Sequence, residues 1–351
     1  MNEAESIEAQ ANGVSSKGGI FQPAKKGRLE GFNLKEFLQD CKNDLVPAFS
    51  PATFGGLQFP NGTLSYIGAR TGRGKTTALV SIAIEAIETA RSVFLYSLEE
   101  DITAIVKRLM LCYAWNLKIT GEAKGIDLAS IDSPLTELNR HIVNETKEGE
   151  GETLNEAKGS IYAHLKHKLK VFRAMGATLE TFIEHIEENA KEGDIVLLDY
   201  IQKMPAKAGG SNEPLERIST ASGELLEAAI KTRCVIISAA QFNRESAKNI
   251  KKGRDNLSEA DFRSCGDIEQ DGHNLIGIGI QRKGVTNEAD YHFYDVLKAR
   301  RGKPHFDNRL SFEGAYSFIK KSSAGKKEKE VEKECVKPIG QSTGKKRRSY
   351  K

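Results

Sequence analysis

The sequence predicts an α/β fold in which a mostly parallel central sheet is flanked by helices and carries antiparallel strands at one edge. Three observations lead to this fold class. A Gly-rich turn joins an apolar strand to a helix in the segment LSYIGARTGRGKTT, residues 64–77. From Leu64 onward, strand-like apolar segments alternate with helical ones. The early strands are short continuous apolar runs, typical of strands buried on both faces, whereas the late ones alternate apolar and polar residues.

The expected elements follow this alternation in chain order. The predicted strands are Leu64–Ile67, Val93–Ser97, Val171–Arg173, Ile195–Tyr200, Val235–Ala239, Leu275–Ile280, Tyr291–Leu297, Arg309–Phe312 and Tyr316–Ile319. The predicted helices are Thr76–Thr89, Asp101–Leu117, Leu179–Lys191 and Leu215–Thr232. Residues 121–170 are polar with little periodicity, so we expect helices and a loop there, peripheral to the sheet.

The turn after the first strand has the composition of a loop that binds the phosphates of a nucleoside triphosphate. Glycines let backbone N–H groups face phosphate oxygens, Lys75 can reach the β- and γ-phosphates, and the Thr76 hydroxyl can bind Mg²⁺. The following helix directs its positive end at the same phosphates. The predicted loop residues are Ala69 (where the usual signature has Gly), Arg70, Thr71, Gly72, Arg73, Gly74, Lys75, Thr76 and Thr77. We therefore expect ATP and Mg²⁺ as cofactors.

Two acidic residues follow the second predicted strand, Val93–Ser97. The carboxyl ends of parallel strands meet at the edge that also holds the phosphate loop. A glutamate at this edge can polarise the water that attacks the γ-phosphate. We favour Glu99 as this catalytic residue. Glu100 competes for the role, and either residue could instead cap the helix that begins near Asp101.

Two later strands also end in polar residues. Asp199 follows four apolar residues in Ile195–Tyr200. A carboxylate at the end of a buried strand is costly unless it is paired, and beside a phosphate loop its natural partner is Mg²⁺. Thr76 and Asp199 are therefore the predicted metal ligands. After Val235–Ala239 comes Gln241, a candidate catalytic residue that could bond the γ-phosphate and report its loss.

Two basic segments follow these strands in the sequence, at residues 203–212 and 244–254. Loops so placed can bind the phosphate backbone of single-stranded DNA. Neither segment contains an aromatic residue that would stack on bases, and a solvated surface charge is the alternative interpretation. The predicted DNA-binding residues are Lys203, Lys207, Arg244, Lys248, Lys251, Lys252 and Arg254.

A pair of cations, Lys298 and Arg300, lies at the end of the strand that begins at Tyr291. Residues at i and i+2 on a strand project to the same face, so the pair could reach one anion. We count both residues as nucleotide-binding candidates. If Arg300 reached the γ-phosphate of a neighbouring subunit, it would act as an arginine finger, which can raise the rate by several powers of ten.

Composition limits the class of protein. The 351 residues include 39% hydrophobic ones, enough for one large domain or two small ones, and no apolar run is long enough to span a membrane. The first residues are polar and acidic and do not resemble a signal peptide. The five cysteines are scattered without a CxxC pair. This pattern indicates reduced thiols and a cytoplasmic location.

The two ends of the chain differ from its centre. We expect a flexible arm at residues 1–31, followed at 32–46 by a short amphipathic helix with its apolar face on Leu34–Leu45. Residues 321–351 form an expected disordered basic tail. From Lys320 to Lys351 there are 12 Lys and Arg residues against 4 Glu, a charge of +8, so the remainder carries about −4. The tail could bind nucleic acid or only aid solubility.

The order of these motifs resembles the motor domain of DnaB-type replicative helicases, which are RecA-like P-loop ATPases. Six segments carry the resemblance over about residues 47–320: GARTGRGKTT, SLEE, LLDYIQKM, SAAQFNRE, DFRSCGDIEQDGHNLIGI and LKARRG. The resemblance implies that Glu99 is the catalytic glutamate, Asp199 the magnesium aspartate and Gln241 the phosphate sensor. It also implies that Lys298 and Arg300 act on a neighbouring subunit's nucleotide.

The same resemblance implies an ATP-dependent helicase of DNA replication, a homo-hexameric ring that moves 5′ to 3′ on single-stranded DNA. Two features depart from the family pattern. About 46 residues precede the motor, too few for the family's helical collar domain, and Gly272-His273 stands where the family tends to have Ala-Asp. The sequence identifies no loader or primase partner. Two alternatives stay open: a nucleotide-switched DNA-binding ATPase, and a filament-forming recombinase without unwinding activity.

Overall fold

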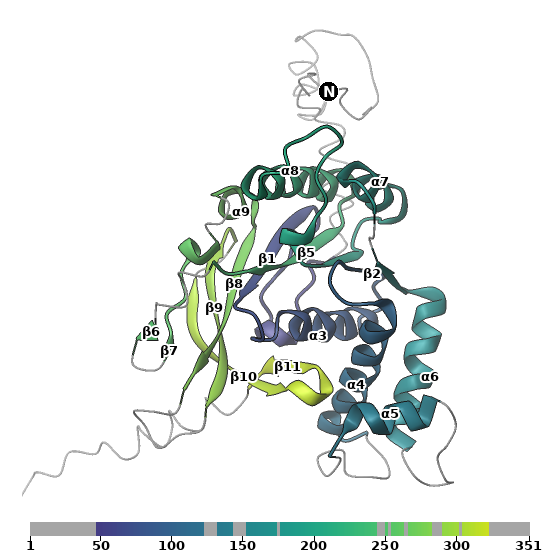
Figure 1. Ribbon diagram of the computed structural model, residues 1–351. Coiled ribbons are helices and arrows are strands. Elements are labelled where there is room, and N and C mark those ends of the chain that lie inside the picture. Colours follow the sequence, from purple (N-terminus) through teal and green to yellow (C-terminus); the bar gives the residue numbers. More distant parts are fainter. Residues whose placement is uncertain are drawn as a thin grey trace, which may run out of the picture.

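The computed structural model describes residues 47–122, 132–142, 152–173, 176–243, 250–251, 254–262, 266–282, 290–301 and 304–322. The predicted arm at 1–31, the predicted helix at 32–46 and the predicted tail from residue 323 onward lie outside these residues. The tail was expected to begin at residue 321, but Lys321 is the last residue of the strand Phe318–Lys321. The described chain folds around one sheet of eleven strands (Figure 1).

The parallel part of the sheet has the order β3-β2-β4-β5-β1-β8. Its strands are β1 (Thr63–Ala69), β2 (Val93–Ser97), β3 (Leu169–Arg173), β4 (Ile195–Asp199), β5 (Val235–Gln241) and β8 (Asn274–Gln281). This order brings the carboxyl ends of β1, β2, β4 and β5 to one edge. The predicted parallel sheet is therefore confirmed, with strand ends within a few residues of those expected.

Antiparallel strands extend the sheet beyond β8, as predicted. They are β9 (Tyr291–Ala299), β10 (His305–Glu313) and β11 (Phe318–Lys321). A small hairpin of β6 (Ile250–Lys251) and β7 (Arg254–Asp255) is attached to β8 through the pairing of Arg254 with Gln281. The sequence did not predict this hairpin, because two-residue strands are too short to show a periodic pattern.

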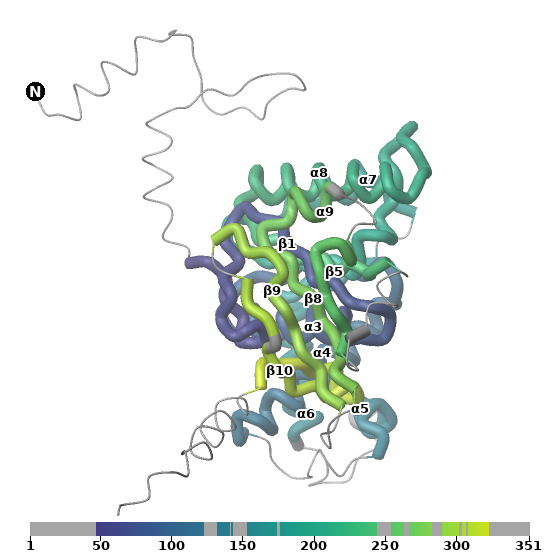
Figure 2. The backbone as a smooth tube through the Cα atoms, turned by 90° about the vertical axis from the view of Figure 1, so that its left-hand side faces the viewer, coloured from purple at the N-terminus to yellow at the C-terminus, as the bar shows by residue number. Residues whose placement is uncertain are grey.

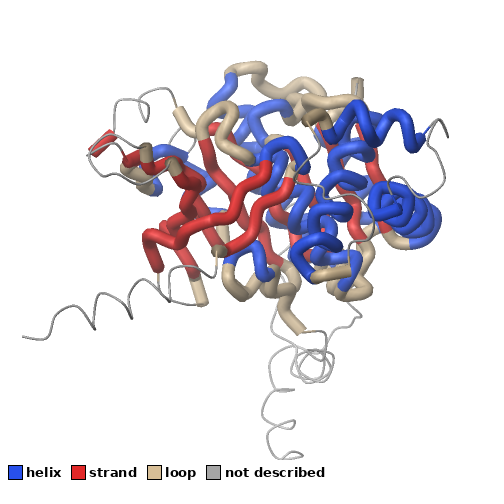
Figure 3. Tube along the Cα trace, turned by 90° about the horizontal axis from the view of Figure 1, so that it is seen from below, coloured by secondary structure: helices blue, strands red, loops and turns tan. Residues whose placement is uncertain are grey.

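Helices cover both faces of the sheet (Figures 1 and 2). One layer contains α3 (Lys75–Glu88), α4 (Ile102–Thr120), α5 (Pro134–Ile142) and α6 (Glu152–His167). The other contains α7 (Leu179–Asn189), α8 (Pro214–Thr232) and α9 (Gly266–Asp271). Seen from below, most of the strands lie towards one side of the molecule and most of the helices towards the other (Figure 3). None of the described helices has the length and apolar character needed to cross a membrane.

Alternation along each central strand produces two separate hydrophobic cores. Leu95, Leu197 and Ile237 pack with α3 and α4. Their sequence neighbours, such as Val196 and Ile236, pack instead with α7 and α8. Because successive strand residues point to opposite faces, a strand covered on both faces must be apolar throughout. This burial explains the continuous apolar runs of the early strands.

Local signals set where the helices begin. Asp101 caps α4, since its Oδ1 accepts a hydrogen bond of 3.0 Å from the Ala104 N–H. Pro214 stands in the first turn of α8, where its missing N–H has no consequence. α9 spans only six residues and was not predicted. The polar stretch expected to hold helices does contain α5 and α6, which pack on α4.

Candidate active site

The phosphate loop lies between the carboxyl end of β1 and the start of α3. Gly72 and Gly74 have φ values of 71° and 91°, in the left-handed region that favours glycine. At Gly74 the space is limited as well, because an added Cβ would lie 2.8 Å from the Phe312 ring. The loop conformation therefore depends on glycine at both predicted positions.

Three predicted residues meet at the mouth of this loop. The Lys75 ammonium donates hydrogen bonds to the carbonyl oxygens of Ala69 (3.3 Å) and Arg70 (3.4 Å). The Thr76 hydroxyl donates to Asp199 Oδ2 at 2.7 Å, which joins α3 to the end of β4. The sequence placed Lys75, Thr76 and Asp199 in one site, and the fold brings them together.

Burial dominates the electrostatics of this cluster. Burial lowers the pKa of Lys75, although the carboxylates of Asp199 and Glu99 partly oppose this change. Burial likewise raises the pKa of Asp199; the Thr76 hydrogen bond opposes the rise, whereas the charge of Glu99 adds to it. Both shifts disfavour the charged forms, so desolvation outweighs the attraction between Lys75 and Asp199. An anion bound to Lys75 or a cation bound to Asp199 would therefore stabilise the charged form of that residue.

The cluster fits a magnesium ion held together with nucleotide phosphates. Asp199 is 1% exposed, and its Oδ1 has no hydrogen-bond partner among the described residues. A buried carboxylate oxygen without a partner is unfavourable, and a cation would satisfy it. Magnesium in such sites typically takes one or two protein ligands besides phosphates and waters, which Thr76 and Asp199 can provide. The described residues contain no metal site of three or more His, Cys, Asp or Glu ligands.

The two glutamates after β2 have different surroundings. Glu100 forms two hydrogen bonds of 2.8 Å with Arg108, one to Nε and one to Nη2. Glu99 is exposed and lies close enough to Lys75 and Asp199 to affect the pKa of both. Asp101, not either glutamate, caps α4. The capping alternative is therefore wrong, and Glu99 is the carboxylate free to face the site.

Gln241, at the end of β5, is held by a neighbouring glutamine. Gln202 lies just after β4; its side-chain amide donates to the Gln241 carbonyl and accepts from the Gln241 N–H, both at 3.0 Å. Arg217 of α8 in turn donates to the Gln202 carbonyl at 3.1 Å. Ala69 pairs with Gln241 in the sheet, so Gln241 lies beside the phosphate loop.

Lys298 and Arg300 lie at the opposite edge of the sheet. Both donate to carbonyls at the end of α9, Lys298 to Glu269 and Arg300 to Gln270. The Arg300 N–H donates to the His273 carbonyl (3.0 Å), and the His273 N–H donates to the carbonyl of Leu64 at the start of β1 (2.7 Å). The pair is thus level with the first residues of β1, whereas the phosphate loop follows its last residue.

His273 lies beside this cationic pair. Burial lowers the pKa of His273 to about 4, and the positive charges of Arg301, Arg300 and Lys298 contribute to the lowering. The imidazole is therefore neutral near neutral pH and adds no charge to the group. This is the position where the sequence departs from the family pattern.

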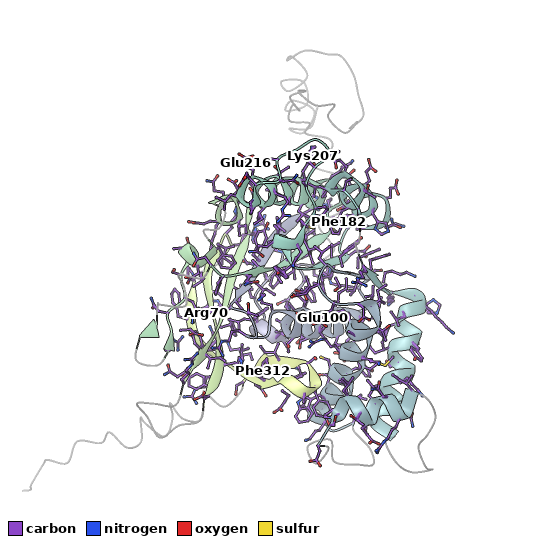
Figure 4. The ribbon with its side chains drawn as sticks, viewed as in Figure 1. Arg70, Glu100, Phe182, Lys207, Glu216 and Phe312 are labelled. Carbon is purple, nitrogen blue, oxygen red and sulfur yellow. The ribbon has the colours of Figure 1, made fainter. Side chains whose placement is uncertain are left out.

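The predicted DNA-binding residues fall into three groups. Lys203 is exposed just after β4. Lys207 forms an ion pair with Glu224, and it lies well away from Arg70 and Phe312 in Figure 4. Arg254 forms an ion pair with Asp295 at 3.2 Å. Lys251 belongs to β6, but its side chain is not among the described parts of the structure. Arg244, Lys248 and Lys252 lie wholly outside the described residues. Their role in DNA binding stays a prediction.

Three residues near the site were missed by the sequence analysis. Gln202 forms hydrogen bonds with the backbone of Gln241. Phe312 packs on Gly74 and stacks on His292. Asp255 forms an ion pair with Arg70. A polar residue following a strand end is a weak signal for Gln202. Phe312 and Asp255 come from late elements and reach the loop only through the order of strands in the sheet, so no local sequence signal could identify them.

Known proteins resemble this chain in sequence and in fold. The family described as DnaB-like helicase C terminal domain matches residues 52–321. Replicative DNA helicases DnaB from two Helicobacter pylori strains are each 27% identical, over 285 and 240 residues. These matches cover 75% and 66% of this chain but 53% and 44% of those proteins. The chain therefore spans about half the length of the curated relatives it matches.

Solved structures share the fold at low sequence identity. A DnaB-like replicative helicase, described with its interactions with primase, gives a TM-score of 0.62 at 18% identity and covers 90% of this chain and 70% of that one. A second solved structure, described as an ATPase domain, gives a TM-score of 0.63 at 19% identity, with coverage of 83% of this chain and 97% of that one. The fold is thus the RecA-like one predicted, and the family match extends over most of the described residues. The chain belongs to the DnaB-like helicase C-terminal domain family.

Proposed function

We propose that this chain is the motor of an ATP-dependent DNA helicase that acts in DNA replication. The observation that carries the proposal is the cluster of Lys75, Thr76 and Asp199 at the carboxyl ends of β1 and β4, with Glu99 exposed beside it. This arrangement suits the transfer of a phosphoryl group from a nucleoside triphosphate to water. The family match favours a helicase over the two alternatives, a switch-like DNA-binding ATPase and a recombinase.

Each residue of the cluster has a distinct role in the proposed hydrolysis. Lys75 binds the β- and γ-phosphates and stabilises the charge that develops on the transferred group. Glu99 orients the attacking water and accepts its proton. Gln241 contacts the γ-phosphate, and its hydrogen bonds with Gln202 connect it to the segment after β4. Loss of the γ-phosphate would therefore change the contacts of Gln241 and, through Gln202, the position of the segment that carries Lys203.

Thr76 and Asp199 would hold the magnesium ion that accompanies the nucleotide. Once bound, the ion would supply positive charge that offsets the negative charge developing on the phosphates during transfer. Before the nucleotide arrives, the Thr76 hydroxyl keeps Asp199 Oδ2 satisfied at 2.7 Å. This hydrogen bond holds both ligands in place, so little rearrangement is needed on binding.

Arg300 is proposed to act on the nucleotide of a neighbouring subunit. Ala69 lies five residues beyond Leu64 along β1, a separation of about 17 Å. Arg300 is level with Leu64, so its side chain is too short to reach its own phosphate loop. A ring, proposed to be a homo-hexamer, would bring Lys298 and Arg300 of one copy to the loop of the next.

The proposed partner of this ring is single-stranded DNA, along which the ring would move in the 5′ to 3′ direction. The proposed location is the cytoplasm. The support is the family match together with basic residues on the segments after β4 and β5. Lys203 is the described residue of this set that is exposed, while Lys207 and Arg254 would have to exchange their ion pairs for phosphate contacts. Such contacts would make binding weaken steeply with salt.

The experiment that tests this function compares ATP hydrolysis by the wild type, Lys75→Ala and Asp199→Asn, with and without single-stranded DNA. We expect DNA-stimulated hydrolysis in the wild type and a loss of about a hundredfold or more in both variants. Lys170→Ala is the control, because Lys170 is exposed on β3 away from the loop. Wild-type turnover in Lys75→Ala would reject the assignment of this site.

A further inference from the structure

The phosphate loop is tied to a distant part of the chain by an ion pair. Arg70 is the first residue after β1, and its Nη1 lies 3.2 Å from Oδ1 of Asp255 in β7. Figure 4 shows Arg70 next to the strands at this end of the sheet. The two side chains are 15% and 3% exposed. Because both are largely withdrawn from water, the pair is screened far less than a surface ion pair.

The position of Arg70 matters for the conformation of the loop. Its carbonyl oxygen accepts hydrogen bonds from the Arg73 N–H at 3.2 Å and from the Lys75 ammonium at 3.4 Å. The same residue therefore contacts Asp255 through its side chain and the phosphate-binding lysine through its backbone. A movement of the loop on nucleotide binding would displace Arg70, and a displacement of Asp255 would disturb the loop.

Asp255 also fixes the β6–β7 hairpin to the sheet. Its second oxygen, Oδ2, accepts a hydrogen bond of 3.0 Å from the Ile280 N–H in β8. The ladder between β7 and β8 consists of one residue pair, Arg254 with Gln281, so this side-chain contact is a substantial part of the attachment. Ile250 and Lys251 pair with Asp255 and Arg254. Asp255 is thus one of the contacts that orient the hairpin, together with the ion pair between Arg254 and Asp295.

The hairpin belongs to the segment expected to bind DNA. Its strands include Lys251 and Arg254, and Lys252 lies between them in the sequence. One buried carboxylate therefore contacts the nucleotide loop through Arg70 and anchors the basic hairpin through Ile280. If the loop moved away from the hairpin, the ion pair between Arg70 and Asp255 would separate and leave two buried charges uncompensated. This cost keeps the loop and the hairpin in a fixed position relative to each other.

We propose that Asp255 is a positioning residue that couples the nucleotide state of the phosphate loop to the DNA affinity of the β6–β7 hairpin. The proposal rests on the function proposed above. Coupling of this kind is reciprocal: if nucleotide changes the affinity for DNA, DNA changes the affinity for nucleotide by the same factor. Asp255 contacts neither phosphate nor base in this scheme and acts only through Arg70 and the hairpin.

The decisive variant is Asp255→Asn, which keeps the volume and an oxygen for the Ile280 N–H but removes the charge that holds Arg70. The measurement is the affinity of the full chain for a fluorescent oligo-dT strand, with and without a non-hydrolysable ATP analogue. We expect the ratio of these two affinities to fall by about fivefold or more relative to wild type. A fluorescent ATP analogue, titrated without DNA, shows that the variant still binds nucleotide.

Asp295→Asn is the matched control. Asp295 is 7% exposed on its side chain and pairs with Arg254 of the same hairpin at 3.2 Å, whereas Asp255 is the carboxylate that lies 3.2 Å from Arg70. Its loss changes DNA affinity equally in both nucleotide states, so the ratio should stay near the wild-type value. Arg70→Lys should retain part of the coupling and Arg70→Gln should lose it. The double variant Arg70→Gln/Asp255→Asn should show the same affinity ratio as either single variant, because both substitutions remove the same ion pair.

A readout that needs neither DNA nor hydrolysis separates this inference from the proposed function. Hydrogen exchange of the peptide 250–262 should slow on nucleotide binding in the wild type and not in Asp255→Asn. Equal slowing in both proteins, no slowing in the wild type, or an unchanged affinity ratio in Asp255→Asn would overturn the coupling role. A wild type that fails to hydrolyse ATP would reject the proposed function instead, while the exchange result would still decide the role of Asp255.

Discussion

Two adjacent glutamates illustrate how surroundings assign roles at the scale of single residues. Glu100 accepts hydrogen bonds from Nε and Nη2 of Arg108, so its charge is already compensated. Glu99 is exposed, and its charge acts on Lys75 and Asp199. A general base must keep its carboxylate accessible to water near the phosphate. The fold therefore favours Glu99 for the proposed catalytic role, as the order of residues after β2 had suggested.

Substituting each glutamate separately tests this assignment. Glu99→Gln should bind ATP with near wild-type affinity and hydrolyse it about a hundredfold or more slowly, because the amide cannot accept the proton. Glu100→Gln should keep most of the hydrolysis rate and lose some stability, since its contact with Arg108 is weakened. Single-turnover hydrolysis and equilibrium nucleotide binding provide the two numbers. A slow Glu100→Gln beside an active Glu99→Gln would show that the roles are reversed.

Residues whose own place in an element signals a role were predictable from the sequence, whereas residues whose role arises only from the packing of distant elements were not. Asp199 is recognisable because a carboxylate ending a buried strand needs a partner. Asp255 has no such signal: it lies in a two-residue strand and becomes important only because β7 lies beside β8 and the phosphate loop. Phe312 reaches Gly74 in the same indirect way.

At the scale of elements, α3 connects the nucleotide site to the first and last described segments. Glu85, near its end, accepts hydrogen bonds from the Thr53 N–H (2.9 Å) and the Thr53 hydroxyl (2.8 Å). Burial raises the pKa of Glu85, while the Thr53 hydrogen bond and the charge of Lys320 oppose the rise. The helix that begins at the phosphate loop therefore carries in its last turn a carboxylate, Glu85, that is destabilised in its charged form.

This arrangement predicts how stability depends on pH. A carboxyl with a higher pKa in the folded state contributes favourably below its unfolded pKa, about 4.3, and loses that contribution as pH rises towards the folded pKa. Glu85→Gln removes the charge and keeps an oxygen for Thr53. Relative to wild type, its free energy of unfolding should therefore increase as pH rises, by about 1.4 kcal/mol for each unit of pKa shift.

Urea unfolding of both proteins at about pH 4 and about pH 7 measures this difference. Glu216→Gln is the surface control, because Glu216 is exposed on α8. If the stability difference between Glu85→Gln and wild type were the same at both pH values, or smaller at the higher one, Glu85 would not have the raised pKa that its burial implies.

The same elements show where sequence patterns stop being informative. The central strands were placed within a few residues because burial on both faces requires a continuous apolar run. The first turn of α4 was expected at Asp101, which instead caps a helix that begins at Ile102. β6, β7 and α9 are too short for any periodicity to develop, and contacts with larger neighbours determine their conformation.

At the scale of the whole molecule, the functional groups lie at two opposite edges of one sheet. Lys75 and Asp199 are at the carboxyl end of the parallel strands, and Arg300 is level with the start of β1. Within one chain these groups cannot meet, because the length of β1 separates them. If Arg300 takes part in hydrolysis, two copies must share each site, so the chain alone is half of the proposed catalytic unit.

Mixing two inactive variants tests this sharing. Arg300→Ala should bind ATP but hydrolyse it about a thousandfold more slowly, as expected for a missing arginine finger. Mixed with Lys75→Ala, it should recover part of the activity, because some interfaces then pair an intact loop with an intact Arg300. Arg300→Ala mixed with Lys298→Ala is the control, since both lack the same side of the interface. Equal recovery in both mixtures, or none in either despite co-assembly, would reject the trans role.

The central claim is that the nucleotide site at the end of β1 drives unwinding of DNA. The most direct measurement is strand displacement from partial duplexes that carry one single-stranded tail, either 5′ or 3′, with wild type and Lys75→Ala assayed in parallel. The account predicts ATP-dependent displacement by the wild type that requires the 5′ tail and is absent in Lys75→Ala. ATP hydrolysis by the wild type without displacement of any strand would contradict the account and favour a nucleotide-switched DNA-binding ATPase instead.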